Sequence, residues 1–235
     1  MDDEQTLGVL RTGAIEVLGL LPYSSNYTFL ARVDPETLAV YKPRRGERPL
    51  WDFPHGSLAG REVAAYLVSE AAGWRIVPPT VLREDAPLGP GSLQLFVEHD
   101  PEVHYFTLME ERADDLIAFA AFDVVVNNAD RKSGHVIEDR SGRLWAVDHG
   151  VTFHLEDKLR TVIWTYAGQP LDKGTIAALE TLGAALAEPG GLGTRLEELL
   201  TPDEVAATLA RTEALLVEGH FPPPPADRPL PWPLV

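Results

Sequence analysis

Short apolar runs separated by turn residues dominate the N-terminal part of the chain. Apolar residues concentrate at positions 14–20, 29–33 and 38–42, and Asp-Pro-Glu-Thr at positions 34–37 separates the last two runs. A fourth run, at positions 92–98, alternates apolar with polar residues. Runs of this length that are bounded by turn-forming residues are typical of β-strands. The pattern therefore predicts a β-rich N-terminal region.

Helical periodicity appears within this region and again after it. Val63, Leu67 and Ala71 recur every four residues, which predicts a helix over residues 60–72. A second apolar face, in a helix that begins near Glu110, consists of Leu116, Phe119, Phe122 and Val126. Because these side chains project from one side, we expect that helix to be buried.

Two further helices are expected towards the C-terminus, over residues 176–187 and 201–219. The second begins with Thr-Pro-Asp-Glu, in which Thr201 is the expected N-cap, Pro202 the first helical residue and Glu204 the third. A Thr and a Glu at this spacing satisfy each other's backbone N–H groups and fix the start of the helix.

The segment 221–235 contains seven prolines and is predicted to be extended rather than helical. Phe221 and Trp232 offer apolar anchors for a strap that packs against the rest of the chain. A loose end and a ligand for an SH3-type domain are the alternatives.

Together these elements predict an α+β protein with two lobes. The N-terminal lobe is expected over residues 1–103, with strands, one helix and a hinge. The C-terminal lobe, over residues 104–220, is expected to be small and mainly helical, and the Pro-rich tail follows at 221–235. A chain of 235 residues is long enough for this division.

Charge and composition narrow the range of functions. The chain carries 20 Lys and Arg against 36 Asp and Glu, a formal net charge of −16, which argues against binding nucleic acid or anionic lipid. It has no cysteine, which excludes disulfides and thiol chemistry and fits a reducing cytoplasm. No signal-peptide pattern opens the sequence, and the apolar run near 116–122 is too short to span a bilayer. We therefore expect a cytoplasmic protein.

The most informative polar segment covers residues 127–150. Asp130 and Asp148 stand at the edges of two short predicted strands, at 136–137 and 144–147. Carboxylates on adjacent strand ends converge well on a metal–phosphate site, where one accepts a proton and the other holds Mg²⁺. A polar β-turn with surface charges is the alternative.

Two more side chains follow Asp130 at spacings known from phosphoryl-transfer loops. Lys132 lies two positions later, where a cation neutralises the transferred phosphoryl group. His135 lies five positions later, where a metal-binding side chain is expected. Asp148 is followed by His149 and Gly150, in the place of a metal-binding Asp before Gly.

The motifs Asn-Asn-Ala-Asp-Arg-Lys, from Asn127, and Val-Asp-His-Gly, from Val147, resemble the phosphatidylinositol 3-/4-kinase-like superfamily. In particular, the chain is similar to short actinobacterial-type kinase-like proteins, and more distantly to HipA kinases and type II phosphatidylinositol 4-kinases. The resemblance covers residues 13–165. It implies a two-lobed protein- or lipid-kinase-like fold that uses ATP and Mg²⁺, with Asp130 as base and Asp148 as metal ligand.

One position departs from that pattern. These families usually have Asn where this chain has His135, and imidazole is a poor ligand for Mg²⁺, which prefers oxygen. Either metal coordination is looser here, with His135 as a second ligand, or His135 hydrogen-bonds phosphate.

A kinase N-lobe also carries a Lys on a strand and an acidic partner on the next helix. Lys42 ends the third predicted strand, and Glu62 lies twenty positions later, early in the predicted helix. We expect this pair to contribute to ATP binding. The alternatives are a solvated Lys and a Glu that merely complements the helix dipole.

The remaining ATP contacts are expected from a loop and a hinge. The loop at 22–28 joins the first two strands and is not glycine-rich, so phosphate contacts are expected from Ser24, Ser25, Asn26 and Thr28. An ordinary hairpin turn is the alternative. The hinge is expected in the strand at 93–97, where backbone groups near Phe96, Val97 and Glu98 would bind adenine.

Two features remain open between a ligand contact and an ordinary structural role. Arg44, Arg45 and Arg48 form the densest basic patch, which suits an anionic ligand or plain solvation. Trp164 lines a substrate pocket or belongs to the core, which is the commoner place for an aromatic residue after a strand.

The predicted function is transfer of the ATP γ-phosphoryl group to a hydroxyl. Because few elements follow Asp148, a small inositol- or sugar-like acceptor is favoured over a membrane lipid. The alternatives are a HipA-like protein kinase or autokinase with a protein hydroxyl as acceptor, transfer of another part of ATP such as AMP, and a regulatory module that binds nucleotide without turnover.

Overall fold

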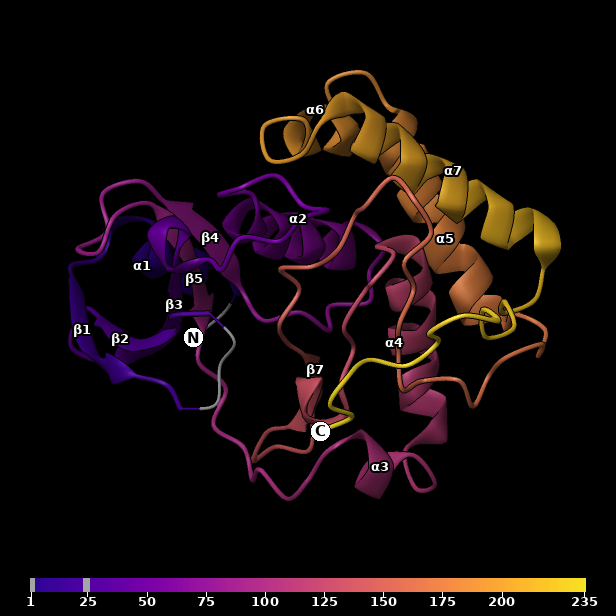
Figure 1. Cartoon of the computed structure of the whole chain (residues 1–235), viewed down its shortest axis with the longest axis horizontal. Helices are drawn as coiled ribbons and strands as arrows, with labels where there is room; N and C mark the ends of the chain where they lie inside the picture. The colour runs from indigo at the N-terminus through magenta and orange to yellow at the C-terminus, as the bar shows by residue number, and fades with distance from the viewer. Residues whose placement is uncertain (1–2, 23–25) are drawn as a thin grey trace.

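The N-terminal lobe is built on a five-stranded antiparallel sheet (Figure 1). The computed structural model describes residues 3–22 and 26–235. The strands follow the spatial order β1-β2-β3-β5-β4 and are β1 (Ile15–Leu20), β2 (Phe29–Val33), β3 (Thr37–Pro43), β4 (Thr80–Arg83) and β5 (Gly91–Leu95). Three of the four apolar runs thus form strands close to their predicted ends, and the fourth forms β5 as far as Leu95.

Alternation of buried and half-buried side chains explains how the sheet packs. Along β3 every second residue is buried, and Ala39 lies opposite Ala31 of β2, with both side chains fully buried. Helix α1 (Asp3–Thr12) packs on this face and contributes Leu10 to the same small core. A period of two along a strand places one face against this core.

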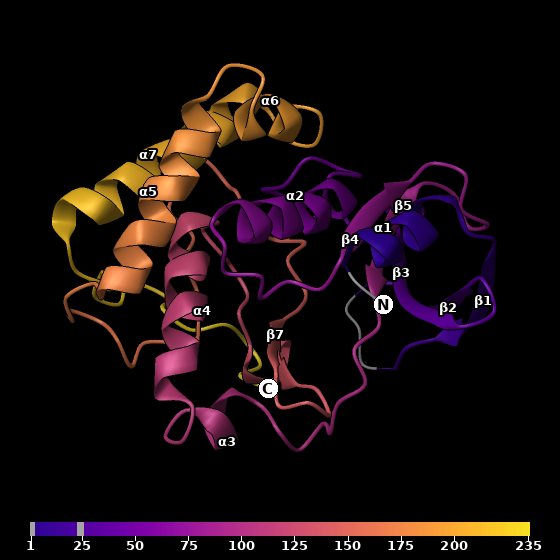
Figure 2. The same ribbon diagram turned by 180° about the vertical axis from the view of Figure 1, so that it is seen from behind.

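Helix α2 (Leu58–Ala71) lies between the sheet and the helices of the C-terminal lobe, as the views from both sides show (Figures 1 and 2). It is buried along almost its whole length, which is unusual for a helix with polar residues. A side chain at Gly60 would place its Cβ 2.9 Å from the carbonyl oxygen of Leu199. The glycine therefore allows α2 to approach the C-terminal lobe closely.

The C-terminal lobe is mainly helical and also contains a two-stranded hairpin. Its helices are α3 (Tyr105–Leu108), α4 (Ala113–Val125), α5 (Lys173–Ala187), α6 (Leu192–Leu196) and α7 (Pro202–Glu218). The hairpin pairs β6 (Val136–Glu138) with β7 (Leu144–Ala146). Short 3₁₀ turns occur at η1 (Arg44–Gly46) and at η2 (Ser133–His135).

The predicted buried helix is α4, and it forms the centre of the larger core. Leu116, Phe119 and Phe122 are each at most 1% exposed. Helix α7 begins as its sequence indicates, because the Thr201 hydroxyl accepts from the Glu204 N–H while the Glu204 carboxylate accepts from the Thr201 N–H. The mixed α+β architecture, with a β-rich N-terminal lobe, is confirmed.

Several elements were not predicted, and each is short or weakly patterned. They are α1, β4, α3 and α6, of which α3 and α6 span four and five residues. The run at 92–98 also ends its pairing at Leu95, because the chain then leaves the sheet towards the C-terminal lobe. Such boundaries depend on packing partners more than on local pattern.

The segment 221–235 contains no helix and crosses the C-terminal lobe as a strap (Figure 1). The Thr161 N–H donates to the Pro229 carbonyl over 3.2 Å, and the Ser133 N–H donates to the Leu234 carbonyl over 2.8 Å. Phe221 is buried, as expected of an anchor, whereas Trp232 is 89% exposed and anchors nothing. The strap is therefore attached by Phe221 and by these backbone hydrogen bonds, and not by Trp232 as predicted. Among the described helices, none has the length and apolar character that a membrane span requires.

Candidate active site

A cavity of about 800 Å³ lies between the sheet and the C-terminal lobe. Its walls come from β3, β5, α2, the loop before β2, the segment that runs from the loop after α4 to Gly150, and the end of the strap at Pro233 and Val235. The cavity brings together most of the predicted site residues that the structure describes, namely Asn26, Thr28, Lys42, Glu62, Phe96, Val97, Lys132, His135 and Asp148.

Lys42 is the centre of an ionic cluster in this cleft. Its ammonium group donates to Glu62 of α2 and, over 2.8 Å, to Asp148. The Glu62 carboxylate is almost fully buried and also accepts from the His149 backbone N–H over 3.0 Å. The cluster therefore joins β3, α2 and the segment after β7, which lie far apart in the sequence.

Burial and opposite charges compete in setting the ionisation of this cluster. Burial by itself would lower the pKa of Lys42, but the carboxylates of Asp148 and Glu62 outweigh it and raise that pKa, so the ammonium is retained. Burial would likewise raise the pKa of Asp148, but the charge of Lys42 outweighs it and lowers that pKa well below its usual range. Asp148 is therefore an ionised carboxylate, and its side chain is 53% exposed.

His135 lies against the same carboxylate. Its Nε2 atom is 3.4 Å from Asp148 Oδ2, and its Nδ1 atom accepts from the Lys132 backbone N–H over 3.4 Å. Burial lowers the pKa of His135 to about 4, so the ring is neutral near pH 7. A neutral ring that accepts at Nδ1 carries its proton on Nε2. In this arrangement His135 presents a donor towards Asp148, not a free lone pair for a metal.

Asp130 and Lys132 form a second ionic pair, in the loop after α4. The Lys132 ammonium lies 3.3 Å from Asp130 Oδ2, and the Asp130 backbone N–H donates to the Asn128 side chain over 3.0 Å. Burial raises the pKa of Asp130 to about 6, although Lys132 opposes that shift. A carboxyl group with a pKa near neutrality suits a general base.

Asp123 of α4 anchors the loop that carries Asp130 through hydrogen bonds. Asp123 is fully buried and accepts from Arg131 Nε over 3.0 Å, from the Asn128 side chain over 2.9 Å and from the Thr161 hydroxyl over 2.9 Å. Arg131 is itself fully buried and also donates to the Val147 carbonyl over 3.0 Å. Asp123 therefore connects this loop with the segment at Thr161, and Arg131 connects it with Val147, which lines the cleft.

Arg131 also contacts His149. Its guanidinium donates to His149 Nε2 over 2.9 Å, and burial followed by the charge of Arg131 lowers the pKa of His149. His149 Nδ1 is buried without a hydrogen-bond partner among the described residues and lies 3.9 Å from Glu62 Oε2. The neutral ring of His149 thus lies between the Arg131 guanidinium and the Glu62 carboxylate.

The supporting roles of Asp123, Arg131, His149 and Thr161 were not predicted from the sequence. One signal for them was present, because Asp123 is the one acidic residue in the stretch from Leu116 to Val125 of α4, which is otherwise apolar. A charge on a buried face requires partners. Which partners these are depends on segments up to 38 positions away along the chain.

The predicted phosphate loop and hinge are only partly in the cleft. Ser24 and Ser25 lie outside the described residues. Asn26 lines the cavity, but its side chain already accepts from the Arg48 backbone N–H over 2.8 Å. Phe96 and Val97 also line the cavity, whereas Glu98 does not and instead forms an exposed ion pair with Arg140. His99 takes the next place in the wall.

The carboxylate of Asp148 is suited to bind Mg²⁺. This ion binds protein through one or two carboxylates, keeps several waters and completes its shell with substrate phosphates. Asp148 supplies one ionised carboxylate in the cleft, which fits that requirement. Within the described ranges no group of three or more His, Cys, Asp or Glu side chains gathers into a complete metal site. A divalent ion would therefore depend on phosphate oxygens for much of its coordination.

Comparisons with solved structures establish the fold. The Golgi casein kinase with Mn/ADP bound superposes with a TM-score of 0.56 at 16% identity, over 92% of this chain and 74% of that one. The hydra Fam20 with sugar superposes with a TM-score of 0.53 at 15% identity, over 92% of this chain and 86% of that one. At these identities the likeness concerns the fold alone, and the fold is kinase-like.

Comparisons of sequence add two relatives, although no model of a protein family matches the chain. Phosphatidylinositol 4-kinase gamma 4 of Oryza sativa subsp. japonica is 28% identical over 187 positions, which cover 68% of this chain but only 33% of that kinase. Protein Rv2133c of Mycobacterium tuberculosis (strain ATCC 25618 / H37Rv) is 40% identical over 273 aligned positions, which cover 99% of this chain and 95% of that protein. The chain therefore belongs to the family of Rv2133c, and it has a kinase-like fold.

Proposed function

We propose that this protein is an ATP-dependent phosphotransferase of the phosphatidylinositol 3-/4-kinase-like type, which transfers the γ-phosphoryl group to a hydroxyl. The observation that carries the proposal is the contact of Lys42 with both Glu62 and Asp148, two residues 20 and 106 positions away. A strand Lys paired with a helix Glu and close to a metal-binding Asp is the arrangement that protein kinases require for activity.

Each of the named residues of the cleft, and Asp130 in the adjoining loop, has a distinct role in this proposal. Lys42, held in place by Glu62, binds ATP phosphates. Asp148 holds Mg²⁺, which when bound neutralises the phosphate oxygens. Asp130 accepts the proton of the attacking hydroxyl, and Lys132 stabilises charge on the transferred group. The adenine ring lies between the lobes beside Phe96 and Val97.

The proposed co-substrates have support from the relatives. One of the similar structures is described as a kinase with Mn/ADP bound, and one relative by sequence is named a phosphatidylinositol 4-kinase. Those properties belong to those proteins, and the cleft of this chain has the ionised carboxylate and the ammonium that nucleotide and divalent metal require. We therefore propose MgATP as the ligand of the cleft.

The acceptor is proposed to be a small alcohol. After Asp148 the C-terminal lobe has three helices, α5, α6 and α7, and α6 spans only five residues. The protein-kinase alternative keeps the same catalytic residues and differs only in the acceptor. A nucleotide-binding module without turnover is the remaining rival, because His135 stands at the position where Asn is usual.

The proposal is tested with [γ-³²P]ATP, Mg²⁺ and a panel of small alcohols, compared between the natural protein and Asp130→Asn. We expect label to move to a small acceptor and the rate to fall by about 10²- to 10⁴-fold in the variant. MgATP should raise the melting temperature of both proteins, since Asp130 acts on the acceptor. Asp114→Asn, at an exposed position of α4, serves as the matched control.

Three other outcomes would each contradict the proposal in a different way. Label on the protein itself would favour the autokinase. Thermal stabilisation by MgATP without turnover would favour the regulatory module. If MgATP produced no stabilisation at all, nucleotide binding in the cleft would be excluded.

A further inference from the structure

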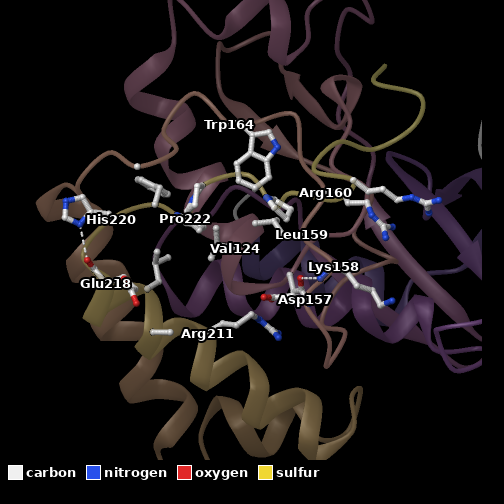
Figure 3. Close-up of a pocket in the computed structure, with 18 of the residues that line it drawn as sticks. Val124, Asp157, Lys158, Leu159, Arg160, Trp164, Arg211, Glu218, His220 and Pro222 are labelled. Atoms are coloured by element: carbon white, nitrogen blue, oxygen red, sulfur yellow. Dashed lines mark hydrogen bonds between the residues drawn. The ribbon is translucent and has the colours of Figure 1, made fainter.

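A second cavity, of about 710 Å³, lies in the C-terminal lobe beside the loop that carries Asp130 (Figure 3). Helices α4 and α7, the segment at 157–160 and the strap at 221–228 enclose it. Figure 3 shows Trp164 and Arg160 on one side of the cavity and Arg211 on the opposite side. It shares no lining residue with the proposed nucleotide cleft, although the strap borders both cavities, so this is a separate site.

Backbone hydrogen bonds place Arg160 directly alongside the catalytic loop. The Arg160 N–H donates to the Asn128 carbonyl over 2.8 Å, and the Arg160 carbonyl accepts from the Arg131 N–H over 3.0 Å. These bonds lie on either side of Asp130 in the loop. Asn127, which begins the loop, also lines the cavity. The cavity therefore adjoins the loop that carries Asp130 through Asn127 and Arg160, although Asp130 itself is not among its lining residues.

The Arg160 guanidinium is available for a ligand. It is half-buried, and in the part of the chain that the structure describes it makes no ion pair and no side-chain hydrogen bond. The neighbouring cations differ in this respect. Lys158 pairs with Asp52 over 3.0 Å, and Arg211 donates to the carbonyls of Val125 and His154.

The guanidinium of Arg228, in the strap, borders the same cavity. Like Arg160, it has no ion-pair partner within the described residues, although Asp157, Glu218 and Asp227 also line the cavity. Two guanidinium groups without a carboxylate partner among the described residues therefore border one cavity. Guanidinium groups in this state suit phosphate or carboxylate oxygens, which they bind in a bidentate manner.

Apolar side chains also line the cavity. Trp164 donates its indole N–H to the Pro229 carbonyl over 3.0 Å, which fixes the ring, and Phe221, which also lines the cavity, is buried. A pocket with an apolar wall and a few convergent polar groups is typical of a small-molecule site. The sequence left open whether Trp164 lines a pocket or belongs to the core, and the structure places it in this wall.

We infer that this cavity binds the acceptor through an anionic group, and that the acceptor is a small alcohol which carries a phosphate monoester. Arg160, with Arg228, binds the phosphate, and Trp164 packs against the carbon skeleton. Arg160 is thus a positioning residue that directs the free hydroxyl towards Asp130. The inference rests on the proposed function, since it names the substrate class of the same enzyme.

The test measures binding by calorimetry in the presence of Mg²⁺ and a non-hydrolysable ATP analogue. The probes are inositol 1-phosphate, neutral inositol and a phosphoserine peptide. We expect the natural protein to bind inositol 1-phosphate at least ten times more tightly than inositol, and Arg160→Gln to weaken that binding by about tenfold or more. Affinity for the ATP analogue should stay the same. Arg11→Gln, at an exposed position of α1 and likewise without an ion pair among the described residues, is the matched control.

The outcomes separate this inference from the proposed function. Equal affinity for the phosphorylated and neutral probes, or an unchanged affinity in Arg160→Gln, would overturn it. Preferential binding of the phosphoserine peptide would overturn the small-molecule assignment. If binding depended on the phosphate but no ATP turnover occurred, the anion site would stand and the proposed kinase activity would be rejected. If turnover occurred without phosphate-dependent binding, the kinase activity would stand and the anion site would be rejected.

Discussion

At the scale of single residues, Asp130 has the ionisation behaviour that most directly links structure to rate. Burial raises its pKa to about 6, the nearby charge of Lys132 lowers it in part, and Asp148 raises it further. A carboxyl group accepts a proton only in its ionised form, which predominates above that pKa. The acidic side of the pH–rate profile should therefore report on Asp130.

We predict that kcat/KM falls as the pH is lowered through about 6, because Asp130 becomes protonated. Replacement Lys132→Met removes the neighbouring cation, which lies 3.3 Å away, so the pKa of Asp130 should rise and the fall in rate should begin at higher pH. The measurement is a pH profile of kcat/KM for both proteins.

The control for this profile is Lys173→Met, which removes an exposed Lys at the start of α5. Its acidic limb should coincide with that of the natural protein. An acidic limb that stays at the same pH in Lys132→Met would show that Asp130 is not the titrating base.

At the scale of elements, the position of the loop that carries Asp130 depends on one buried carboxylate in α4. Asp123 and Arg131 are both fully buried, and Asp123 also binds Asn128 and Thr161. A buried ion pair contributes little net stability, but removal of one partner leaves the other as an uncompensated charge. The loop and the segment at Thr161 would then lose their common anchor.

Replacement Asp123→Ala is predicted to lower the free energy of unfolding by about 3–5 kcal/mol, because Arg131 is left buried and unpaired. Urea denaturation measures the change. On the same helix, Asp115→Ala removes an exposed partner of Arg112 and should change stability by less than about 1 kcal/mol. If the two variants were equally stable, the loop would have another anchor.

At the scale of the whole molecule, a buried ion pair joins the lobes. Arg61 of α2 pairs with Glu204 of α7 over 2.5 Å and donates to the Thr152 carbonyl over 2.6 Å. The Arg61 guanidinium also lies 4.9 Å from the centre of the Phe53 ring. One side chain of the N-terminal lobe thus contacts the last helix and the segment after Asp148, on which the geometry of the cleft depends.

We predict that Arg61→Met lowers the free energy of unfolding by about 3–5 kcal/mol, since it leaves Glu204 buried without its cation. The double variant with Glu204→Gln should recover part of that loss, because the isolated charge is then absent. Urea denaturation of the single and double variants measures both effects. Arg195→Met, at an exposed position of α6, is the control.

No recovery in the double variant would indicate that the loss arises from the packing of Arg61 against Phe53 and not from the unpaired charge. A loss smaller than about 1 kcal/mol in Arg61→Met would show that the lobes are held together by apolar packing alone.

Much of the fold follows from short-range pattern in the sequence. The strands β1, β2 and β3 and the helices α2, α4, α5 and α7 follow local periodicity, and the start of α7 follows from Thr201 and Glu204. The spacing of Lys42 to Glu62 and of Asp130 to Asp148 also indicated which side chains to expect together. In each case the information lies in residues close to one another along the chain.

The tertiary structure alone decided what surrounds those residues. It placed Lys42 against Asp148, assigned Asp123 and Arg131 to the support of the loop, turned Glu98 away from the cleft and left Arg160 unpaired beside the second cavity. These outcomes depend on which distant segments pack together and on how far each charge is removed from water. The hydrophobic periodicity of the sequence indicates which face of a helix or strand is buried. Ion pairing and the pKa values of side chains instead depend on the neighbours that folding brings within a few ångströms.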